Sequence, residues 1–279
     1  MLTKEEYIKN HSYMSFTRFC KFLNCEAAGL VNYKFSSTKA LLIGSYVDAY
    51  FSDELEEFKT EHLEIFNSRT GELKTDYIQA DELIKRIESD EQLLKFLSGE
   101  KQKIFVGEIS GVKFKVKIDA YDVNHHITDL KVMKDFKPVW INGYKSNFIE
   151  AYNYDIELAI FQEIVFQNTG VRVPCYIAGI TKENPSDVGI FSISQKQLDE
   201  AMRIVLNNLP RIKLLLEGKV APHRCEECEY CRKTKKSKVI PYELAGMSGD
   251  QLRENGIECD DLKLLEERKK ENDTLEKLS

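Results

Sequence analysis

The chain has 279 residues, of which 42% are hydrophobic and 31% charged, and its formal net charge is −6. This composition supports a sizeable core and argues against a protein that coats nucleic acid nonspecifically, because such proteins are usually basic. No apolar run approaches the roughly 18–20 residues that span a bilayer, and "MLTKEEYIKNHSYM" is not a secretory signal, so we expect a cytoplasmic protein that binds no membrane.

Helical patterns dominate the first hundred residues. The segment "SYMSFTRFCKFLNCEAAGL", residues 12–30, predicts a helix that begins at a serine or threonine cap. Residues 36–58 have small polar residues followed by apolar positions at helical spacing, which predicts another helix. Residues 59–76 are polar and contain glycine, which indicates a surface loop. Residues 77–98 predict an amphipathic helix or a pair of helices.

A strand-rich block follows, with apolar and polar residues alternating over 103–109, 112–122 and 126–132, which predicts a three-stranded meander. A long helix is expected from about Asn147 to a C-cap at Gly170, and then strands over 173–182 and 189–194. Ser194 and Gln197 stand in capping-box register before a helix that closes on Gly218. This order predicts an α/β fold with a central mixed β-sheet flanked by helices. We expect one domain over residues 1–240 and a charged peripheral tail over 241–279.

Two acids and a lysine lie at one end of the predicted hairpin "KIDAYDVNHHITDLK". Asp129 and Lys131 project from the same face of their strand, and Asp119 closes the preceding strand near the same end. Carboxylates that converge repel one another unless a cation lies between them, and Mg²⁺ or Mn²⁺ prefers such oxygen ligands. Lys131 would then position or deprotonate a water, or stabilise charge in a transition state. The alternative is a solvated ion pair on an exposed hairpin.

This arrangement resembles the PD-(D/E)XK nuclease superfamily, and more narrowly the phage and prophage RecE-like and lambda-type exonucleases. The resemblance implies a restriction-endonuclease-like core with Asp119, Asp129 and Lys131 as catalytic residues. The family's further metal ligand follows a glycine by four positions, which places Asp48 of "GSYVDAY" in the metal site. Glu108, one predicted strand before Asp119, either approaches the ion or faces water.

The chain departs from the family's Gln-x-x-x-Tyr motif. Glu157 and Phe161 of "YDIELAIFQEI" occupy those two places, and Tyr154 shares their helical face. Glu157 lacks the donor of an amide, so we expect it to tune Lys131 or to reach the metal through water. The alternative is a polar residue at the edge of a helix.

The sequence "HRCEECEYCRK" carries Cys225, Cys228 and Cys231, and such spacing lets three thiolates converge on zinc or an iron–sulfur cluster. A fourth ligand is needed: His223 is near in sequence and Cys25 is distant. AddB-type and CRISPR-adaptation nucleases, which this pattern resembles, hold a 4Fe–4S cluster with one cysteine before the core and three after it, which implies Cys25. Zinc with His223, or free thiols, are the alternatives.

The leading hypothesis is a Mg²⁺-dependent DNA exonuclease that hydrolyses linear duplex from its ends in phage-type recombination. By resemblance, such enzymes assemble as homo-oligomeric rings and work beside a single-strand annealing protein. Two alternatives stay open: a noncatalytic nucleic-acid-binding module with a zinc-stapled C-terminal knuckle, and a nuclease related to those of CRISPR adaptation.

Overall fold

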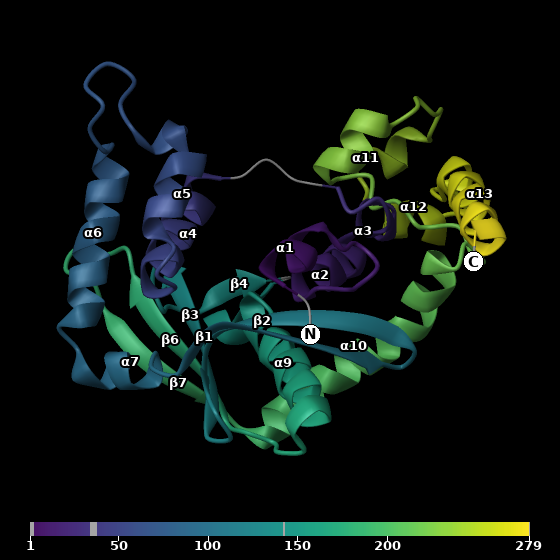
Figure 1. The fold of residues 1–279 in the computed structure, drawn as a ribbon. Helices are drawn as coiled ribbons and strands as arrows, with labels where there is room; N and C mark the ends of the chain where they lie inside the picture. The colour runs from purple at the N-terminus through teal and green to yellow at the C-terminus, as the bar shows by residue number, and fades with distance from the viewer. Residues whose placement is uncertain (1–2, 34–37, 142, 279) are drawn as a thin grey trace. The chain divides into compact units, whose positions relative to one another are not determined.

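A computed structural model describes residues 3–33, 38–141 and 143–278, and its elements are labelled in Figure 1. The chain forms two compact units. The first comprises residues 1–10, 37–107 and 115–203, and the second comprises residues 11–36, 108–114 and 204–279. Our expected boundary between residues 240 and 241 stays a prediction.

A five-stranded sheet of order β1-β2-β3-β6-β7 forms the centre of the fold. Its strands are β1 (Glu100–Ile109), β2 (Val112–Asp122), β3 (His126–Met133), β6 (Cys175–Thr181) and β7 (Val188–Ile193). β3 and β6 run parallel, whereas β2 pairs with β3 and β6 pairs with β7 in antiparallel fashion. β6 is buried along almost its whole length, as expected of a central strand covered on both faces. The prediction of a mixed sheet flanked by helices is confirmed.

Helices of the first unit cover both faces of this sheet (Figure 1). On one face, α4 (Lys39–Phe51) and α6 (Thr75–Glu88) pack against apolar side chains of β3 and β6, in a core that includes Tyr46, Val47, Ile84, Leu130 and Ile180. On the other face lies α9 (Tyr154–Thr169), whose residues contact the β3 side chains opposite to Leu130. The remaining helices of this unit are α1 (Lys4–Lys9), α5 (Leu55–Glu61), η1 (Leu63–Ile65), α7 (Glu91–Phe96) and α8 (Phe148–Ala151).

Three predicted helices are each divided in the structure. The helix expected over residues 12–30 consists of α2 (Phe16–Asn24) and α3 (Glu26–Leu30), which meet at Cys25. The helix expected over residues 36–58 ends at Phe51 and resumes at Leu55, because Asp53 adopts a left-handed backbone (φ 60°). Its expected start at Ser36 lies outside the described residues. The loop expected over 59–76 is partly helical, since it contains the end of α5 and η1. The helix expected from Asn147 is interrupted by Asn153 (φ 59°), while its predicted C-cap at Gly170 (φ 73°) is confirmed.

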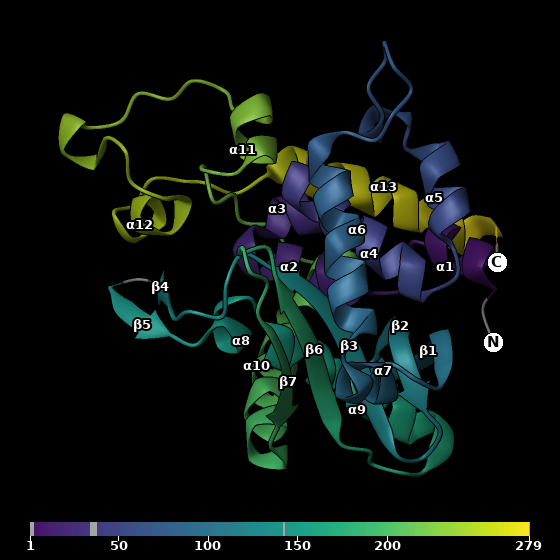
Figure 2. The same ribbon diagram turned by 90° about the vertical axis from the view of Figure 1, so that its left-hand side faces the viewer.

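A short hairpin that the sequence reasoning missed lies between β3 and α8. Its strands are β4 (Val139–Ile141) and β5 (Tyr144–Ser146), which form a separate two-stranded sheet. Figure 2 shows this hairpin beside α8 and outside the five-stranded sheet.

The second unit is mostly helical. It contains α2 (Phe16–Asn24), α3 (Glu26–Leu30), α11 (Glu229–Thr234), η2 (Tyr242–Leu244), α12 (Gly249–Glu254) and α13 (Leu262–Leu278). Helix α10 (Gln195–Leu216) begins at the predicted capping box, in which Ser194 N donates to Gln197 Oε1 (3.2 Å) and Gln197 N donates to Ser194 Oγ (3.3 Å). None of the helices in the described part of the chain is long and apolar enough to cross a bilayer.

Candidate active site and cysteine centre

Asp119 and Asp129 lie where strands β2 and β3 part. In the described pairing, Ala120 faces Thr128, and toward the start of β2 no further pair of residues follows. Instead, the backbone amide of Leu130 donates to Asp119 Oδ2 at 2.9 Å. The carboxylate thus replaces a backbone partner, which fixes its orientation beside Asp129. This hydrogen bond from Leu130 holds the carboxylate of Asp119 next to the strand that carries Asp129, which is the proximity expected from the sequence.

Lys131 lies between two carboxylates. Its Nζ is 2.6 Å from Asp129 Oδ2 and 2.9 Å from Glu157 Oε2, and all three side chains are less than a fifth exposed. Asp129 and Lys131 share a face of β3, and Glu157 reaches them from the first turn of α9. Burial disfavours the ammonium charge, but the two carboxylates outweigh burial and raise the pKa of Lys131. Lys131 is therefore held in its charged form.

Two tyrosines complete the surroundings of this ion-pair group. The Tyr154 ring centroid is 4.9 Å from Lys131 Nζ, a cation–π contact. Tyr7 on α1 has a pKa raised to about 12 by burial and by the charges of Glu157 and Asp119. Lys115 anchors Tyr7, because its Nζ lies 4.9 Å from the ring and donates to the carbonyl oxygen of Asn10 at 2.7 Å. Phe161 is buried on the next turns of α9.

Gln102 on β1 joins Asp48 to Asp119. Its Nε2 lies 3.3 Å from Asp48 Oδ1 and 3.3 Å from Asp119 Oδ1, and it donates to Ser52 Oγ at 2.8 Å. Gln102 has a left-handed backbone (φ 49°), which is uncommon outside glycine and often accompanies functional sites. Sequence reasoning missed this residue because a glutamine within a strand carries no signal of such a conformation.

Burial and neighbouring acids disfavour the charged forms of Asp48 and Asp129. Burial and the charge of Asp119 raise the pKa of Asp48 to about 7. Burial, together with Glu157 and Asp119, also raises the pKa of Asp129 despite the opposing charge of Lys131. A cation bound between these carboxylates would favour their charged forms.

The donor chemistry fits a hard divalent cation, although the oxygens are not tightly gathered. Gln102 Oε1 is buried without a hydrogen-bond partner, so this oxygen acceptor remains available, whereas Asp129 Oδ2 and Glu157 Oε2 are ion-paired with Lys131. Among residues 3–33, 38–141 and 143–278, however, these carboxylates do not form a group of three ligand atoms within 4.8 Å of one another. Asp48, Asp119 and Asp129 are the residues that would hold the cation.

Two further residues of the expected site are Glu108 and Gly44. Glu108 is exposed near the end of β1 and belongs to the second unit, and its approach to the ion stays a prediction. Gly44, the glycine of the "GSYVDAY" pattern, has open space where a Cβ would lie, so packing alone does not require glycine there.

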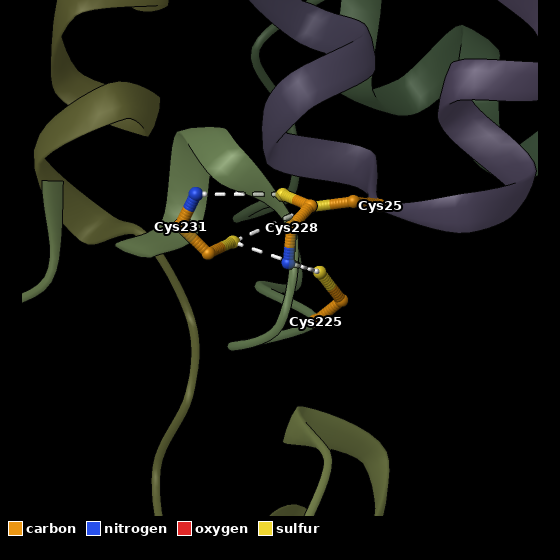
Figure 3. A group of neighbouring side chains, drawn as sticks. All are labelled: Cys25, Cys225, Cys228 and Cys231. Carbon is orange, nitrogen blue, oxygen red and sulfur yellow. Dashed lines mark hydrogen bonds between the residues drawn. The ribbon is translucent and has the colours of Figure 1, made fainter. Parts of the chain in front are cut away.

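Four cysteines gather in the second unit. Cys25 lies at the junction of α2 and α3, while Cys225, Cys228 and Cys231 lie in and just before α11 (Figure 3). Their four sulfur atoms are all within 4.8 Å of one another. Cys25 thus completes the group, whereas His223 Nδ1 lies 2.7 Å from Asp260 Oδ1 and is not a member of it.

The local geometry suits thiolates that bind a metal. Cys25 Sγ is 3.5 Å from Cys231 Sγ, and Cys225 Sγ is 3.8 Å from Cys231 Sγ. A tetrahedral ion with Zn–S bonds of about 2.3 Å separates its sulfurs by about 3.8 Å. The amide of Cys228 donates to Cys225 Sγ, and the amide of Cys231 donates to Cys228 Sγ. The hydrogen bond with Cys231 lowers the pKa of Cys25 to about 5, which favours its thiolate.

Glu26 ties the two distant segments of the cysteine group together. Its carboxylate accepts hydrogen bonds from Arg211 Nε (2.5 Å) and Nη2 (2.8 Å) and from the amide of His223 (2.8 Å). The amide of Ala27 donates to the carbonyl oxygen of His223 at 3.1 Å. These bonds hold Cys25 beside the loop that carries the other three cysteines.

Comparisons with known proteins show the family to which the chain is similar. Residues 15–234 match the model of a PDDEXK-like domain of unknown function (DUF3799). A crystal structure of a protein from Eubacterium rectale, described as a candidate exonuclease, is 39% identical and superposes with a TM-score of 0.84, covering 88% of this chain and 99% of its own. A second solved structure, SSO0001, covers 79% of this chain at 14% identity with a TM-score of 0.31, which is too low to support an inference. No curated protein matches significantly.

Proposed function

The chain belongs to the PDDEXK-like family DUF3799, and from this membership we propose that it is a divalent-metal-dependent deoxyribonuclease that degrades linear DNA from its ends. The description of the relative from Eubacterium rectale supports the exonuclease activity. The observation that carries the proposal is the meeting of Asp119, Asp129 and Lys131 at the point where β2 and β3 part.

Asp48, Asp119 and Asp129 would hold a Mg²⁺ or Mn²⁺ ion. Such an ion supplies a Lewis acid that polarises the scissile phosphate. Carboxylate oxygens are the ligands that these ions prefer, and a bound cation would stabilise the charged forms of Asp48 and Asp129, whose pKa values are raised by burial and neighbouring acids. Gln102 positions two of these ligands, because one amide nitrogen contacts both Asp48 and Asp119.

Lys131 is proposed to stabilise the negative charge that develops on the phosphate. Of the roles considered from sequence, charge stabilisation agrees best with an ammonium group flanked by Asp129 and Glu157. Glu157 would act through Lys131 as a positioning residue, since its carboxylate lies 2.9 Å from Nζ. The family's glutamine could not form this ion pair, so the departure from the motif has a physical consequence.

Digestion of end-labelled DNA tests the proposal. Wild type with MgCl₂ should degrade a linear duplex and leave a covalently closed circle intact. In EDTA it should digest neither. Asp129→Asn should abolish digestion. Asp122→Asn changes a more exposed acid three residues beyond Asp119 and should leave digestion unchanged. Digestion by Asp129→Asn at the wild-type rate would refute the assigned site, and cleavage of the circle would refute exonuclease action.

The four cysteines are proposed to form a structural metal centre. The resemblance noted from sequence implies a 4Fe–4S cluster, whereas the S···S distances of 3.5 and 3.8 Å match a single tetrahedral zinc ion. Anaerobic purification, followed by metal analysis and an absorbance spectrum, distinguishes the iron–sulfur cluster from the zinc ion. Zinc at one equivalent without visible absorbance identifies the ion, and about four irons with broad absorbance identify the cluster. Metal-free protein that is fully folded would contradict both.

The wider role follows from the resemblance to phage exonucleases. We propose that the enzyme acts in recombination, beside a single-strand annealing protein and as a homo-oligomeric ring. Sedimentation of the full chain with and without linear duplex tests the ring, and a monomer under both conditions would rule it out.

A further inference from the structure

The segment from β4 to the end of α8 exposes three large aromatic side chains. Trp140 is 66% exposed, Tyr144 is 59% exposed and Tyr152, after α8, is 48% exposed. Trp140 is the single tryptophan of the chain. Tryptophan is mostly buried in folded proteins, so an indole exposed on a three-residue strand calls for a partner outside the fold.

The residues that flank the hairpin pack into the fold on both sides of it. Phe136 and Phe148 flank the hairpin, and their rings stack with each other and with Phe191 of β7 at centroid distances of 5.0–5.5 Å. Phe148 is buried. Gly179 of β6 permits this packing, because a Cβ there would lie 2.8 Å from the Phe136 ring. The fold therefore supports the hairpin without help from Trp140.

The hairpin strands and the residues before them combine an exposed aromatic ring with lysines. Trp140 lies directly opposite Lys145, whose Nζ is 5.6 Å from the centre of the indole ring. Lys134 and Lys137 precede the hairpin and are exposed, with Lys134 near Asp135 and Lys137 paired to Glu183. Residues 134–152 hold three lysines and two acids in a chain whose net charge is −6. Aromatic rings beside lysines are the combination that binds unpaired nucleobases and their phosphates.

The hairpin is also continuous with the site. It is inserted between β3, which carries Asp129 and Lys131, and α9, which carries Glu157. The Tyr152 ring lies 5.7 Å from the Tyr154 ring, which in turn contacts Lys131. Two neighbouring rings, the exposed Tyr152 and the partly buried Tyr154, thus lead from the end of α8 to Lys131.

We propose that the β4–β5 hairpin binds unpaired nucleotides at a DNA end, with Trp140 stacking on a base and Lys145 contacting a phosphate. This inference rests on the proposed function, because it assigns the hairpin to the DNA substrate of that site. It implies that the enzyme prefers an end with a few unpaired nucleotides over a blunt end.

The single tryptophan makes the test direct, and the test needs no turnover. The full chain is titrated in EDTA with a twelve-residue oligothymidylate, and both indole fluorescence and the anisotropy of a labelled oligonucleotide are followed. We expect saturable quenching of the indole. Trp140→Ala should weaken binding about 5- to 150-fold, the range of a lost base–aromatic stack, and Trp140→Phe should retain most of the affinity. A blunt duplex of two fully complementary strands should bind more weakly than the oligothymidylate.

Tyr242→Ala provides the matched control, since Tyr242 is an 86% exposed aromatic residue far along the chain, and it should bind like wild type. Equal affinity of wild type and Trp140→Ala, or equal affinity for the blunt duplex and the single strand, would overturn the inference. Because binding is measured without metal, failure of DNA digestion would refute the proposed function and leave this titration interpretable.

Discussion

Removal of the Lys131 ammonium group should destabilise the first unit strongly. The variant Lys131→Met keeps an unbranched apolar chain but leaves Asp129 and Glu157 without their shared cation. Breaking a buried ion pair by removing one partner costs about 3–5 kcal/mol, because a charge remains buried and uncompensated. With a denaturant slope of about 2 kcal/mol per molar urea, a loss of about 4 kcal/mol lowers the midpoint by roughly 2 M.

Urea unfolding in EDTA, followed by circular dichroism, measures this effect. Lys137→Met is the control, because Lys137 pairs with Glu183 at 3.1 Å on an exposed surface. Exposed pairs contribute little to stability, so this variant should unfold close to wild type. If Lys131→Met unfolded at the same urea concentration as Lys137→Met, the ammonium group would not be buried between two carboxylates, and our description of the site would be wrong.

Three further variants test other parts of the structure. Gln102→Ala should reduce DNA digestion at low Mg²⁺ by about tenfold or more, and high Mg²⁺ should partly restore it. Residues that position metal ligands typically contribute 10- to 100-fold to metal affinity. An unchanged Mg²⁺ dependence would exclude a positioning role. Cys25→Ser should lose bound zinc or iron in metal analysis, whereas Cys175→Ser, at a buried thiol outside the cysteine group, should retain it; equal metal content in both would argue against Cys25 as a ligand. Phe148→Ala should lower the free energy of unfolding by about 3–5 kcal/mol and expose residues 134–146 to protease; resistance equal to wild type would show that the ring does not anchor the hairpin.

The features predicted well from sequence have local causes. Alternation of apolar residues predicted the strands over 112–122 and 126–132, and Gly170 and Ser194 end and begin helices through hydrogen bonds within a few residues. The prediction that Asp129 and Lys131 share a face follows from the same two-residue period. Cys25 was reached through resemblance, since nothing local connects it to a loop about 200 residues away.

The features that were missed leave no regular pattern in the sequence. The breaks at Asp53 and Asn153 need single residues with positive φ, which an otherwise continuous helical pattern hides. The three-residue strands β4 and β5 are too short for alternation to show. Gln102 matters only because β1 places its amide between acids from α4 and β2, and no pattern near residue 102 indicates those partners.

Isothermal titration of the full chain with Mn²⁺ tests most directly whether the acids form a divalent-cation site. Mn²⁺ prefers oxygen over thiolate ligands, so the cysteine centre should not interfere. Wild type and Asp122→Asn should bind Mn²⁺ with the same affinity, and Asp119→Asn should bind it at least about tenfold more weakly, because it loses a charged ligand held in place by Leu130 and Gln102. Equal binding by wild type and Asp119→Asn, or no binding by wild type, would contradict the account.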